Sequence, residues 1–230
     1  MKFYIDDVRF DVVNKVMDLY PVDGVTSNPS VLKNAGAEPV GRLREIRALI
    51  GQEKMLMSQV VSTDAESMVR EAHVLKDIIA DEAGENYFVK LPAVPQGIKA
   101  IKQLAAEGVR CNATGIYSVT QGLVAMGAGA KAIAPYVNRI DNLGGDGLGV
   151  TRELKEIADA NGYDVSIVPG SIKSVKQVIE CAKMAIAGVA IAAPVFDALF
   201  ANPTVDAAID KFNADFADLV GEGKTYLDLV

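Results

Sequence analysis

Short apolar segments alternate with amphipathic segments along the whole chain, and this alternation constrains the fold more than any other feature. The apolar segments have the length and composition of buried strands and lie at residues 2–6, 24–28, 55–61, 87–92, 109–114, 132–138, 164–168 and 188–192. Strict alternation of strand and helix is typical of parallel strands joined by helical crossovers. Eight such units in 230 residues predict an α/β fold of the (β/α)8 TIM-barrel type.

The main alternative is a doubly wound open sheet. That fold usually carries a glycine-rich phosphate loop after its first strand, and neither a GxGxxG nor a Walker pattern follows residues 2–6. A further amphipathic helix comes after the eighth unit, which a barrel does not need. We therefore expect one barrel domain over residues 1–230, in which 205–230 form a C-terminal helix and tail that pack on a neighbouring subunit or on their own barrel.

The charge and the N-terminus exclude several classes of partner. A net charge of -7 provides no basic footprint for nucleic acid or for an anionic membrane. The segment MKFYIDDVRFD has charges where a signal peptide needs its apolar core, and no apolar run is long enough to span a bilayer. We expect a cytoplasmic protein with no nucleic-acid or membrane partner.

Cysteine and histidine offer little chemistry. Cys111 and Cys181 lie far apart in apolar segments without metal-type spacing, which is typical of free buried thiols. The single histidine, His73, falls in a charged helical segment. We therefore expect neither a metal site nor a catalytic pair or triad based on histidine.

Polar side chains recur near the C-terminal ends of the apolar segments, where barrel enzymes place their active sites. Sorted by the alternation of faces along a strand, the set comprises Asp6, Thr26, Asn28, Gln59, Lys90, Asn112, Thr114 and Tyr136. Each could instead be a satisfied core polar group, since buried polar groups normally find partners. Because most of the predicted strands contribute such a side chain at the same end of the barrel, an active site is the favoured interpretation.

Lys90 is the most distinctive member, because it interrupts the apolar stretch YFVKLPAV. It could lie on an exposed edge strand or pair structurally with Asp6. In a barrel interior, burial would lower the pKa of its amine, and a neutral lysine forms Schiff bases with carbonyl compounds. This is class I aldolase chemistry without a cofactor, in which Asp6 would transfer protons at the imine. Tyr136, or a water held by Gln59 and Thr114, would move the proton of the hydroxyl that becomes an aldehyde.

A phosphate site is predicted at the seventh unit. The segment VPGSIKSVKQ leaves the strand through Ser171 and enters a helix, which is the usual phosphate position in these barrels. Arg139 follows the sixth segment and can bind phosphate with two hydrogen bonds. The structural alternative is a capped helix start and a surface arginine.

These residues and several longer motifs resemble the small transaldolase family, and in particular its fructose-6-phosphate aldolase subgroup. The similarity covers nearly the whole chain through FYIDD, GVTSNPS, SQVVSTDAESMV, VKLPAVPQGIKAIKQLAAEGV, APYVNRID and NPTVDAAIDKF. The resemblance implies that Lys90 is the Schiff-base lysine, Asp6 the proton shuttle and Asn28 a ligand of substrate hydroxyls. It also implies that Thr114 and Gln59 hold a catalytic water, that Arg139 and Ser171 bind phosphate, and that the chain forms a homo-oligomer, a pentamer or decamer.

Two positions favour the aldolase subgroup, because transaldolases carry Glu at Gln59 and Phe at Tyr136. Asn112 points the other way, since the aldolases carry an apolar residue there, and Asp7 and VPGS also depart from the usual pattern. The leading expectation is cleavage or synthesis of fructose 6-phosphate, or a related ketose phosphate, through dihydroxyacetone and glyceraldehyde 3-phosphate. The alternatives are a transaldolase of the pentose phosphate pathway and a silent barrel that binds sugar phosphates or serves as a ring scaffold.

Overall fold

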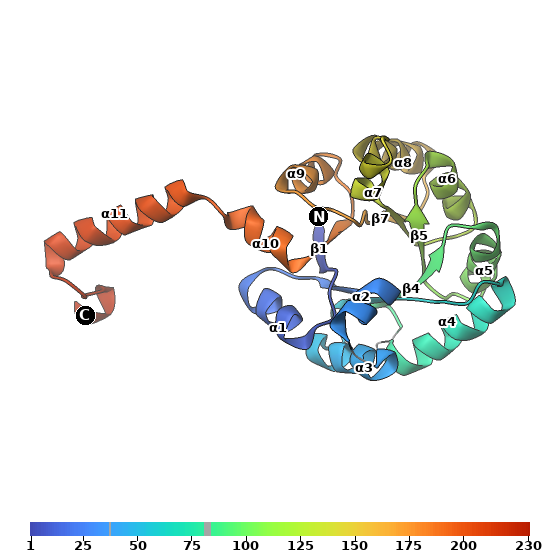
Figure 1. Ribbon diagram of the computed structural model, residues 1–230, viewed down its shortest axis with the longest axis horizontal. Helices are drawn as coiled ribbons and strands as arrows, with labels where there is room; N and C mark the ends of the chain where they lie inside the picture. Colours follow the sequence, from blue (N-terminus) through green and yellow to red (C-terminus); the bar gives the residue numbers. More distant parts are fainter. Residues whose placement is uncertain (37, 81–83) are drawn as a thin grey trace. The chain divides into compact units, whose positions relative to one another are not determined.

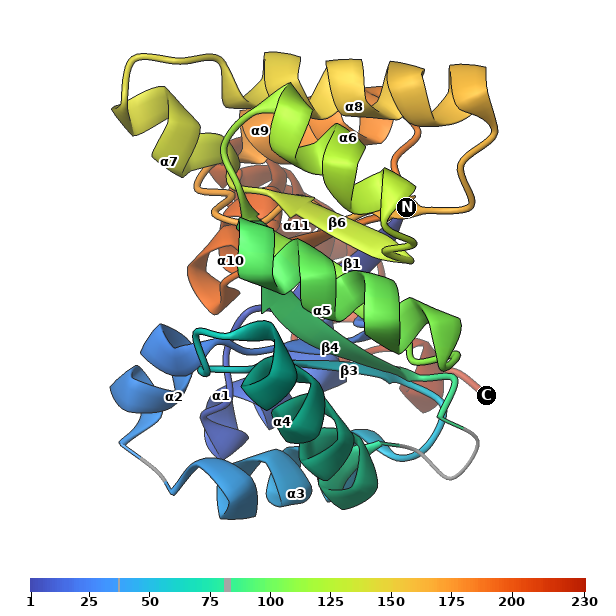
Figure 2. The same ribbon diagram turned by 90° about the vertical axis from the view of Figure 1, so that its right-hand side faces the viewer.

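The computed structural model describes residues 1–36, 38–80 and 84–230. The chain divides into two compact units, Met1–Phe196 and Asp197–Val230. In the first unit, helices surround a ring of strands (Figure 1), and Figure 2 shows α4, α5 and α6 outside the strands. The strands are β1 (Lys2–Ile5), β2 (Gly24–Thr26), β3 (Met55–Gln59), β4 (Tyr87–Pro92), β5 (Cys111–Ile116), β6 (Ala132–Pro135), β7 (Ser166–Ile167) and β8 (Gly188–Ile191).

The eight strands form one parallel sheet in the order β7-β6-β5-β4-β3-β2-β1-β8. β1 pairs with both β2 and β8, and an isolated parallel bridge joins Ile172, just after β7, to Ile191 in β8. The sheet therefore closes almost completely on itself. The predicted (β/α)8 TIM barrel is confirmed.

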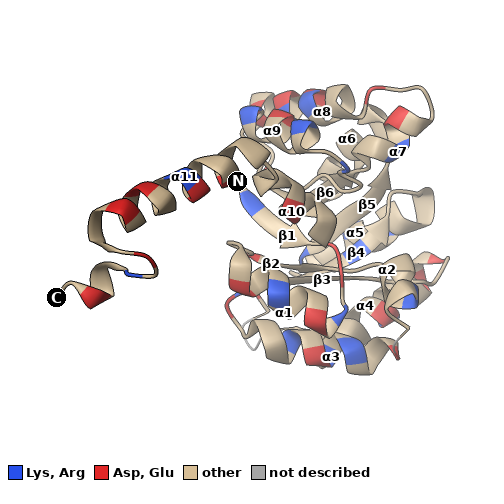
Figure 3. Ribbon diagram, turned by 60° about the vertical axis from the view of Figure 1, so that its left-hand side comes forward, with Lys and Arg blue, Asp and Glu red and all other residues tan. Residues whose placement is uncertain are grey.

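Helices follow every strand of the barrel. They are α1 (Phe10–Leu19), α2 (Pro29–Ala35), α3 (Pro39–Ile50), α4 (Ala65–Ile79), α5 (Pro95–Ala106), α6 (Val119–Gly127), α7 (Val137–Asn142), α8 (Gly147–Asn161), α9 (Val175–Lys183) and α10 (Ala193–Phe200). Both signs of charge alternate along α3 and α8 (Figure 3), and Lys155 pairs with Asp159 one turn later on α8. Such pairs contribute little stability, so burial of the inner helix faces holds the barrel together.

Inward-facing side chains of the strands fill the barrel interior, as the alternation of faces predicts. Tyr4, Met55, Met57, Phe88, Ala132 and Val168 form one buried cluster. Lys90 lies two residues beyond Phe88 and pairs in register with Gln59 on β3 and Asn112 on β5. Because side chains alternate between faces, Lys90 extends from this apolar layer toward the C-terminal mouth of the barrel.

Most strands end earlier than predicted, and at β2 and β6 the difference concerns predicted site residues. Residues 24–28 were expected to be one strand, but β2 ends at Thr26 and Asn28 caps α2. The Oδ1 of Asn28 accepts hydrogen bonds from the backbone N of Ser30 at 2.9 Å and of Val31 at 3.0 Å. Likewise, β6 ends at Pro135 and Tyr136 precedes the first residue of α7. Capping by Asn and a following Pro29 favour a helix start over strand continuation.

The second unit contains α11 (Pro203–Val220) and the short 3-10 helix η1 (Tyr226–Asp228). Asn202 caps α11, and the rings of Phe216 and Tyr226 lie 4.8 Å apart between centroids. None of the residues of α11 is buried. Among the described residues, no helix combines the length and the apolar character needed to cross a membrane.

Candidate active site

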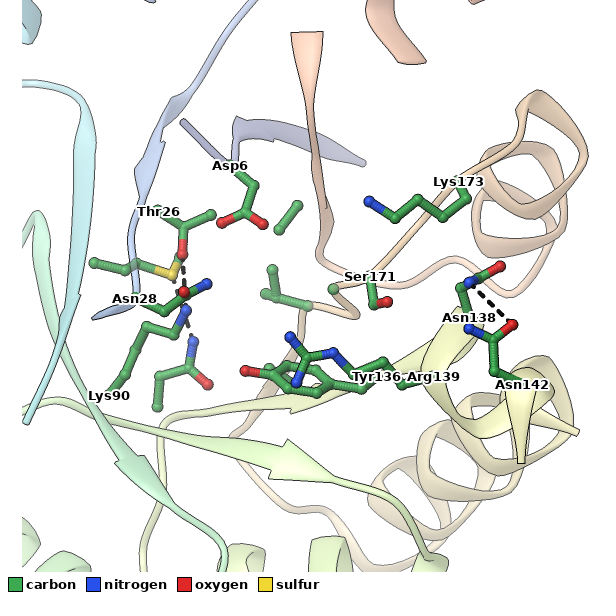
Figure 4. Close-up of a pocket in the computed structure, with 16 residues that line it drawn as sticks. Asp6, Thr26, Asn28, Lys90, Tyr136, Asn138, Arg139, Asn142, Ser171 and Lys173 are labelled. Atoms are coloured by element: carbon green, nitrogen blue, oxygen red, sulfur yellow. Dashed lines mark hydrogen bonds between the residues drawn. The ribbon is translucent and has the colours of Figure 1, made fainter. Parts of the chain in front are cut away.

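A cavity of about 300 Å³ opens at the mouth of the barrel. It is lined by polar side chains that come from six of the eight strands or the segments that follow them. They include Asp6, Thr26, Asn28, Lys90, Asn112, Tyr136, Asn138, Arg139, Asn142, Ser171 and Lys173. Figure 4 shows these groups facing a common space, with Lys90 and Asp6 at one end and Lys173, Asn138 and Asn142 at the other.

Lys90 is the buried cation of this cavity, with 5% of its surface exposed. Its Nζ donates hydrogen bonds to the Oγ1 of Thr26 at 3.1 Å and to the backbone carbonyl of Ser27 at 3.0 Å. An ammonium has three donors, so these partners leave one direction for another acceptor. Burial lowers the pKa of the Lys90 amine, and the positive charge of Arg139 lowers it further, while Asp6 opposes the shift.

Asp6 faces Lys90 across the cavity (Figure 4). Burial raises the pKa of its carboxyl above the ordinary value, and the charges of Lys90, Lys173 and Arg139 only partly oppose that increase. Both members of the pair are therefore shifted toward their neutral forms. A neutral amine beside a carboxylic acid is the combination that attack on a carbonyl and loss of water require.

Tyr136 lies at the junction of the two ends of the cavity. Its hydroxyl is 2.9 Å from the Oγ1 of Thr114, and the guanidinium of Arg139 lies over its ring at 4.7 Å from the centroid. Burial raises the pKa of the Tyr136 phenol, so this group is protonated at neutral pH. The cation above the ring would stabilise a phenolate if the proton were transferred.

The far end of the cavity is cationic. Arg139 extends from α7, and Ser171 and Lys173 come from the segment between β7 and α9. The backbone N of Asn138 donates to the carbonyl of Ser171 at 3.0 Å, which holds the two segments together. Ser171 has a φ of 56°, a left-handed conformation that is rare for residues other than glycine. Two cations and a hydroxyl in this arrangement can bind a phosphate group.

Gln59 and Thr114 are the two predicted site residues that do not line the Lys90 cavity. Thr114 reaches it indirectly, through its contact with Tyr136. Gln59 lines an adjacent cavity together with Pro29, Val60 and other residues at the ends of β3 and β4. The remaining predicted residues lie together around the Lys90 cavity.

Three polar lining residues were missed in the sequence analysis. Lys173 follows Ser171 by two positions in the predicted phosphate segment, so its charge was a usable signal. Asn138 and Asn142 occupy the same side of α7 and approach each other at 3.5 Å. Their role could not be inferred because residues 132–138 were expected to be a strand rather than the start of a helix.

Asn112 carries an unpaired buried acceptor. It is 1% exposed, and its Nδ2 is 3.4 Å from the thioether sulfur of Met57, a weak acceptor. Within the described part of the chain, nothing donates to its Oδ1. A buried oxygen without a donor is destabilising by about 1–3 kcal/mol, so a hydroxyl-bearing ligand or a water would gain from this position. The described residues contain no group of three or more His, Cys, Asp or Glu side chains that could hold a metal ion.

Comparison with known proteins identifies the family of the chain. Residues 3–224 match the family model described as "Transaldolase/Fructose-6-phosphate aldolase". A "Probable fructose-6-phosphate aldolase" of Streptococcus pneumoniae (strain ATCC 700669 / Spain 23F-1) is 37% identical over 217 residues, covering 94% of this chain and 96% of the relative. A "Probable transaldolase" of Methanococcus maripaludis (strain C7 / ATCC BAA-1331) is 36% identical over 216 residues, covering 94% and 97%.

Solved structures of low sequence identity share the fold. A structure described as "Native KDPGal structure" superposes with a TM-score of 0.57 at 13% identity, covering 82% of this chain and 81% of the other. A mandelate racemase/muconate lactonizing enzyme-like protein from Rubrobacter xylanophilus DSM 9941 gives 0.58 at 11% identity, covering 84% and 57%. These similarities concern the barrel alone.

The family match covers nearly all of the chain and includes every residue that lines the cavity. Enzymes of this family are class I aldolases that form a Schiff base with a lysine and need no cofactor. The chain belongs to the transaldolase/fructose-6-phosphate aldolase family and is an enzyme of that type.

Proposed function

We propose that the protein is a class I aldolase that cleaves fructose 6-phosphate to dihydroxyacetone and glyceraldehyde 3-phosphate and catalyses the reverse reaction. The observation that carries this proposal is the buried Lys90 amine, whose lowered pKa leaves it reactive beside Asp6. The cationic end of the same cavity supports a phosphorylated substrate. Arg139, Ser171 and Lys173 would bind the phosphate, and Thr26, Asn28 and Asn112 would bind hydroxyl groups.

The reaction begins with attack of the neutral Lys90 amine on the C2 carbonyl of the ketose. Asp6, whose pKa is raised by burial, donates a proton to the departing hydroxyl, and water leaves from the carbinolamine. The resulting iminium withdraws electrons from the C3–C4 bond. Asp6 is then a carboxylate beside the iminium that it helped to form.

Cleavage of the C3–C4 bond releases the aldehyde and leaves an enamine on Lys90. The C4 hydroxyl must lose a proton in this step, and C3 of the enamine must gain one. The neutral phenol of Tyr136 is the proposed relay: it takes the C4 proton while it passes its own proton, through water, to the carboxylate of Asp6, and the reverse transfer protonates C3. Arg139 over the ring stabilises the phenolate character that develops during each transfer. Thr114 holds the phenol in place, and Gln59 at the neighbouring cavity is proposed to help hold the water that hydrolyses the iminium. Addition of this water at C2, with Asp6 taking its proton, then frees dihydroxyacetone and Lys90.

Borohydride trapping tests the lysine chemistry. Incubation with dihydroxyacetone and borohydride should reduce the imine and add the mass of the reduced triose to the peptide that contains Lys90. Fructose 6-phosphate alone should also give continuous aldehyde release. An unmodified Lys90 peptide would refute the proposal and favour a silent barrel.

A transaldolase is the second candidate, supported by Asn112. Its unpaired Oδ1 beside Lys90 could accept a hydroxyl of a retained dihydroxyacetone unit. Retention would favour transfer to a second sugar over release. Turnover of fructose 6-phosphate that required erythrose 4-phosphate would establish this alternative and exclude the aldolase.

We further propose that the chain forms a homo-oligomer, a pentamer or decamer, in which residues 205–230 pack on a neighbouring subunit. Exposed apolar side chains recur at helical spacing on α11, at Val205, Ile209, Phe212 and Leu219. A helix with an apolar stripe needs a partner surface. Mass photometry should show Phe212→Glu dissociating into smaller species, whereas Asn213→Glu on the same helix should keep the assembly; an unchanged mass for both would refute this role.

A further inference from the structure

Two segments at the mouth of the barrel share a sequence pattern and a conformation. Ile-x-Ser-Val-x-Gln occurs at residues 116–121 after β5 and again at 172–177 after β7. The residue before each pattern is left-handed, with φ of 70° at Gly115 and 56° at Ser171. Each pattern ends in a capping box at the start of a helix, α6 or α9. The chain therefore uses the same turn twice.

The glutamine has the same task in both capping boxes. The Oε1 of Gln121 accepts from the backbone N of Tyr117 at 2.9 Å and of Ser118 at 3.2 Å. The Oε1 of Gln177 accepts from Lys173 at 2.7 Å and from Ser174 at 3.2 Å. Each glutamine thus fixes the backbone of the residue that occupies the second position of the pattern.

The two glutamines differ in what their Nε2 contacts. That of Gln121 donates to the carbonyl of Ala93 at 3.1 Å, whereas that of Gln177 donates to the Oδ2 of Asp141 at 3.1 Å. Asp141 lies two residues after Arg139 on α7, and its Oδ1 accepts from the backbone N of Gly147 at 2.8 Å. The almost buried Gln177, with 9% exposed, therefore connects the segment of Lys173 to the helix of Arg139.

We propose that Gln177 is a positioning residue for the phosphate group, acting through Asp141. The three groups that face the phosphate end belong to two separate segments: Arg139 to α7, and Ser171 and Lys173 to the turn before α9. Binding of a tetrahedral dianion requires their spacing to be fixed. Backbone hydrogen bonds from Val137 to Gly170 and from Asn138 to Ser171 join the start of α7 to the turn. The Gln177–Asp141 hydrogen bond adds a second connection beyond Arg139 and so limits rotation of α7 against the segment of Lys173. The inference rests on the proposed function, and it makes phosphorylated aldehydes the preferred acceptors over unphosphorylated ones.

Gln177→Glu separates capping from bridging. Glutamate at this position still completes a capping box, because its carboxylate accepts the same two backbone hydrogen bonds. It cannot donate to Asp141, and the two carboxylates repel. Gln177→Glu combined with Asp141→Asn restores a hydrogen bond of reversed direction and the original net charge. Gln121→Glu is the matched control, because it removes the same kind of donor from the other capping box.

The readout is binding of inorganic phosphate by the full chain, measured by calorimetry, together with aldehyde kinetics. Gln177→Glu should raise the phosphate Kd and the KM for glyceraldehyde 3-phosphate about tenfold, leaving kcat and the KM for glyceraldehyde unchanged. The double variant should return near the wild-type values, and Gln121→Glu should not differ from wild type. Asp141→Asn alone removes a negative charge, so electrostatics would tighten phosphate binding. Its single amide oxygen can accept from the Nε2 of Gln177 or from the backbone N of Gly147 but not from both, so a weakened connection should instead weaken phosphate binding.

Several results would overturn the inference: equal effects of Gln177→Glu and Gln121→Glu, no recovery in the double variant, tighter phosphate binding by Asp141→Asn, or no phosphate binding by the wild type. The phosphate measurement does not depend on turnover. Failure to trap Lys90 with dihydroxyacetone would therefore refute the aldolase while the phosphate data still decide the role of Gln177.

Discussion

Two buried cations lie among the described residues of the barrel, and they differ in how many hydrogen-bond acceptors the fold provides for each. Arg47 on α3 is 7% exposed, and its guanidinium donates to the carbonyls of Ile79, Gly51, Lys54 and Asn86 at 2.8–3.0 Å. These carbonyls lie at helix ends and just before β3 and β4, at the end of the barrel opposite the mouth. Lys90 at the mouth is equally buried but has two protein acceptors and faces a cavity.

We infer from this difference that Arg47 is a structural cation and that Lys90 is the reactive one. Arg47 has no access to a ligand and keeps its charge, because a guanidinium does not lose its proton in proteins. Lys90 is an amine whose charged form is disfavoured by burial, and it retains a direction free for substrate. Burial of a charged side chain therefore does not by itself indicate a functional site. A buried charged side chain with an unfilled hydrogen-bond direction toward a cavity is the better indicator.

The largest effect is expected at Lys90. Lys90→Met should reduce turnover by a factor of roughly 10⁴ or more, because no other group can form the imine. The folded structure should persist, as judged by circular dichroism and a cooperative urea transition. Lys99→Met, on the exposed side of α5, should retain wild-type turnover; residual activity of Lys90→Met near wild type would remove the distinction between the two cations.

Arg47 should show the reverse behaviour. Arg47→Met should lower the free energy of unfolding by about 3 kcal/mol, because several buried carbonyls lose their donor. Turnover per folded molecule should stay close to wild type, since Arg47 does not line the Lys90 cavity. Urea denaturation measures the loss, and Arg44→Met at an exposed position of the same helix should change stability little. A stable Arg47→Met would show that the four hydrogen bonds do not stabilise the barrel.

The pH dependence of borohydride trapping at Lys90 tests how neighbouring charges shift the pKa of its amine. Only the neutral amine attacks, so the rate of borohydride trapping should rise with pH through the lowered pKa of Lys90 and then level. Asp6 raises that pKa and Arg139 lowers it. Asp6→Asn should therefore move the rising limb to lower pH and Arg139→Gln to higher pH, whereas Asp164→Asn at an exposed site should leave it in place. Shifts in the same direction for both variants would contradict this account.

The smallest effect is expected at Ser171, a cavity residue whose backbone has a left-handed conformation that is unfavourable for serine. Ser171→Gly should stabilise the protein by about 1 kcal/mol, because glycine tolerates the left-handed conformation. It should also raise the KM for phosphorylated aldehydes about tenfold by removing a hydroxyl donor. Ala185→Gly relieves a similar φ of 52° after α9 and should stabilise without changing KM. Equal kinetics for both variants would exclude a phosphate contact by the Ser171 hydroxyl.

Most of the fold and part of the site could be predicted from local patterns. The eight strands and their parallel pairing follow from the regular alternation of short apolar segments with helical segments, because a parallel sheet buried on both faces needs apolar strands joined by helices. The inward direction of Lys90 follows from the alternation of side chains along its strand. The alternation of faces along each strand also placed Asp6, Thr26 and Asn112 on the side of the cavity. Strand ends were less predictable, as Asn28 and Tyr136 show, because helix capping competes with strand extension at the same residues.

The sequence by itself determined the barrel and the family and singled out Lys90 as a candidate, since these depend on composition, period and motif. Only the tertiary structure decided which polar groups share one cavity. It placed Gln59 beside an adjacent cavity, brought Lys173 to the phosphate end and left the Oδ1 of Asn112 without a donor. It also connected Gln177 to Asp141 across 36 positions of the chain. Such contacts depend on distances between segments that are remote in sequence, and no local pattern encodes those distances.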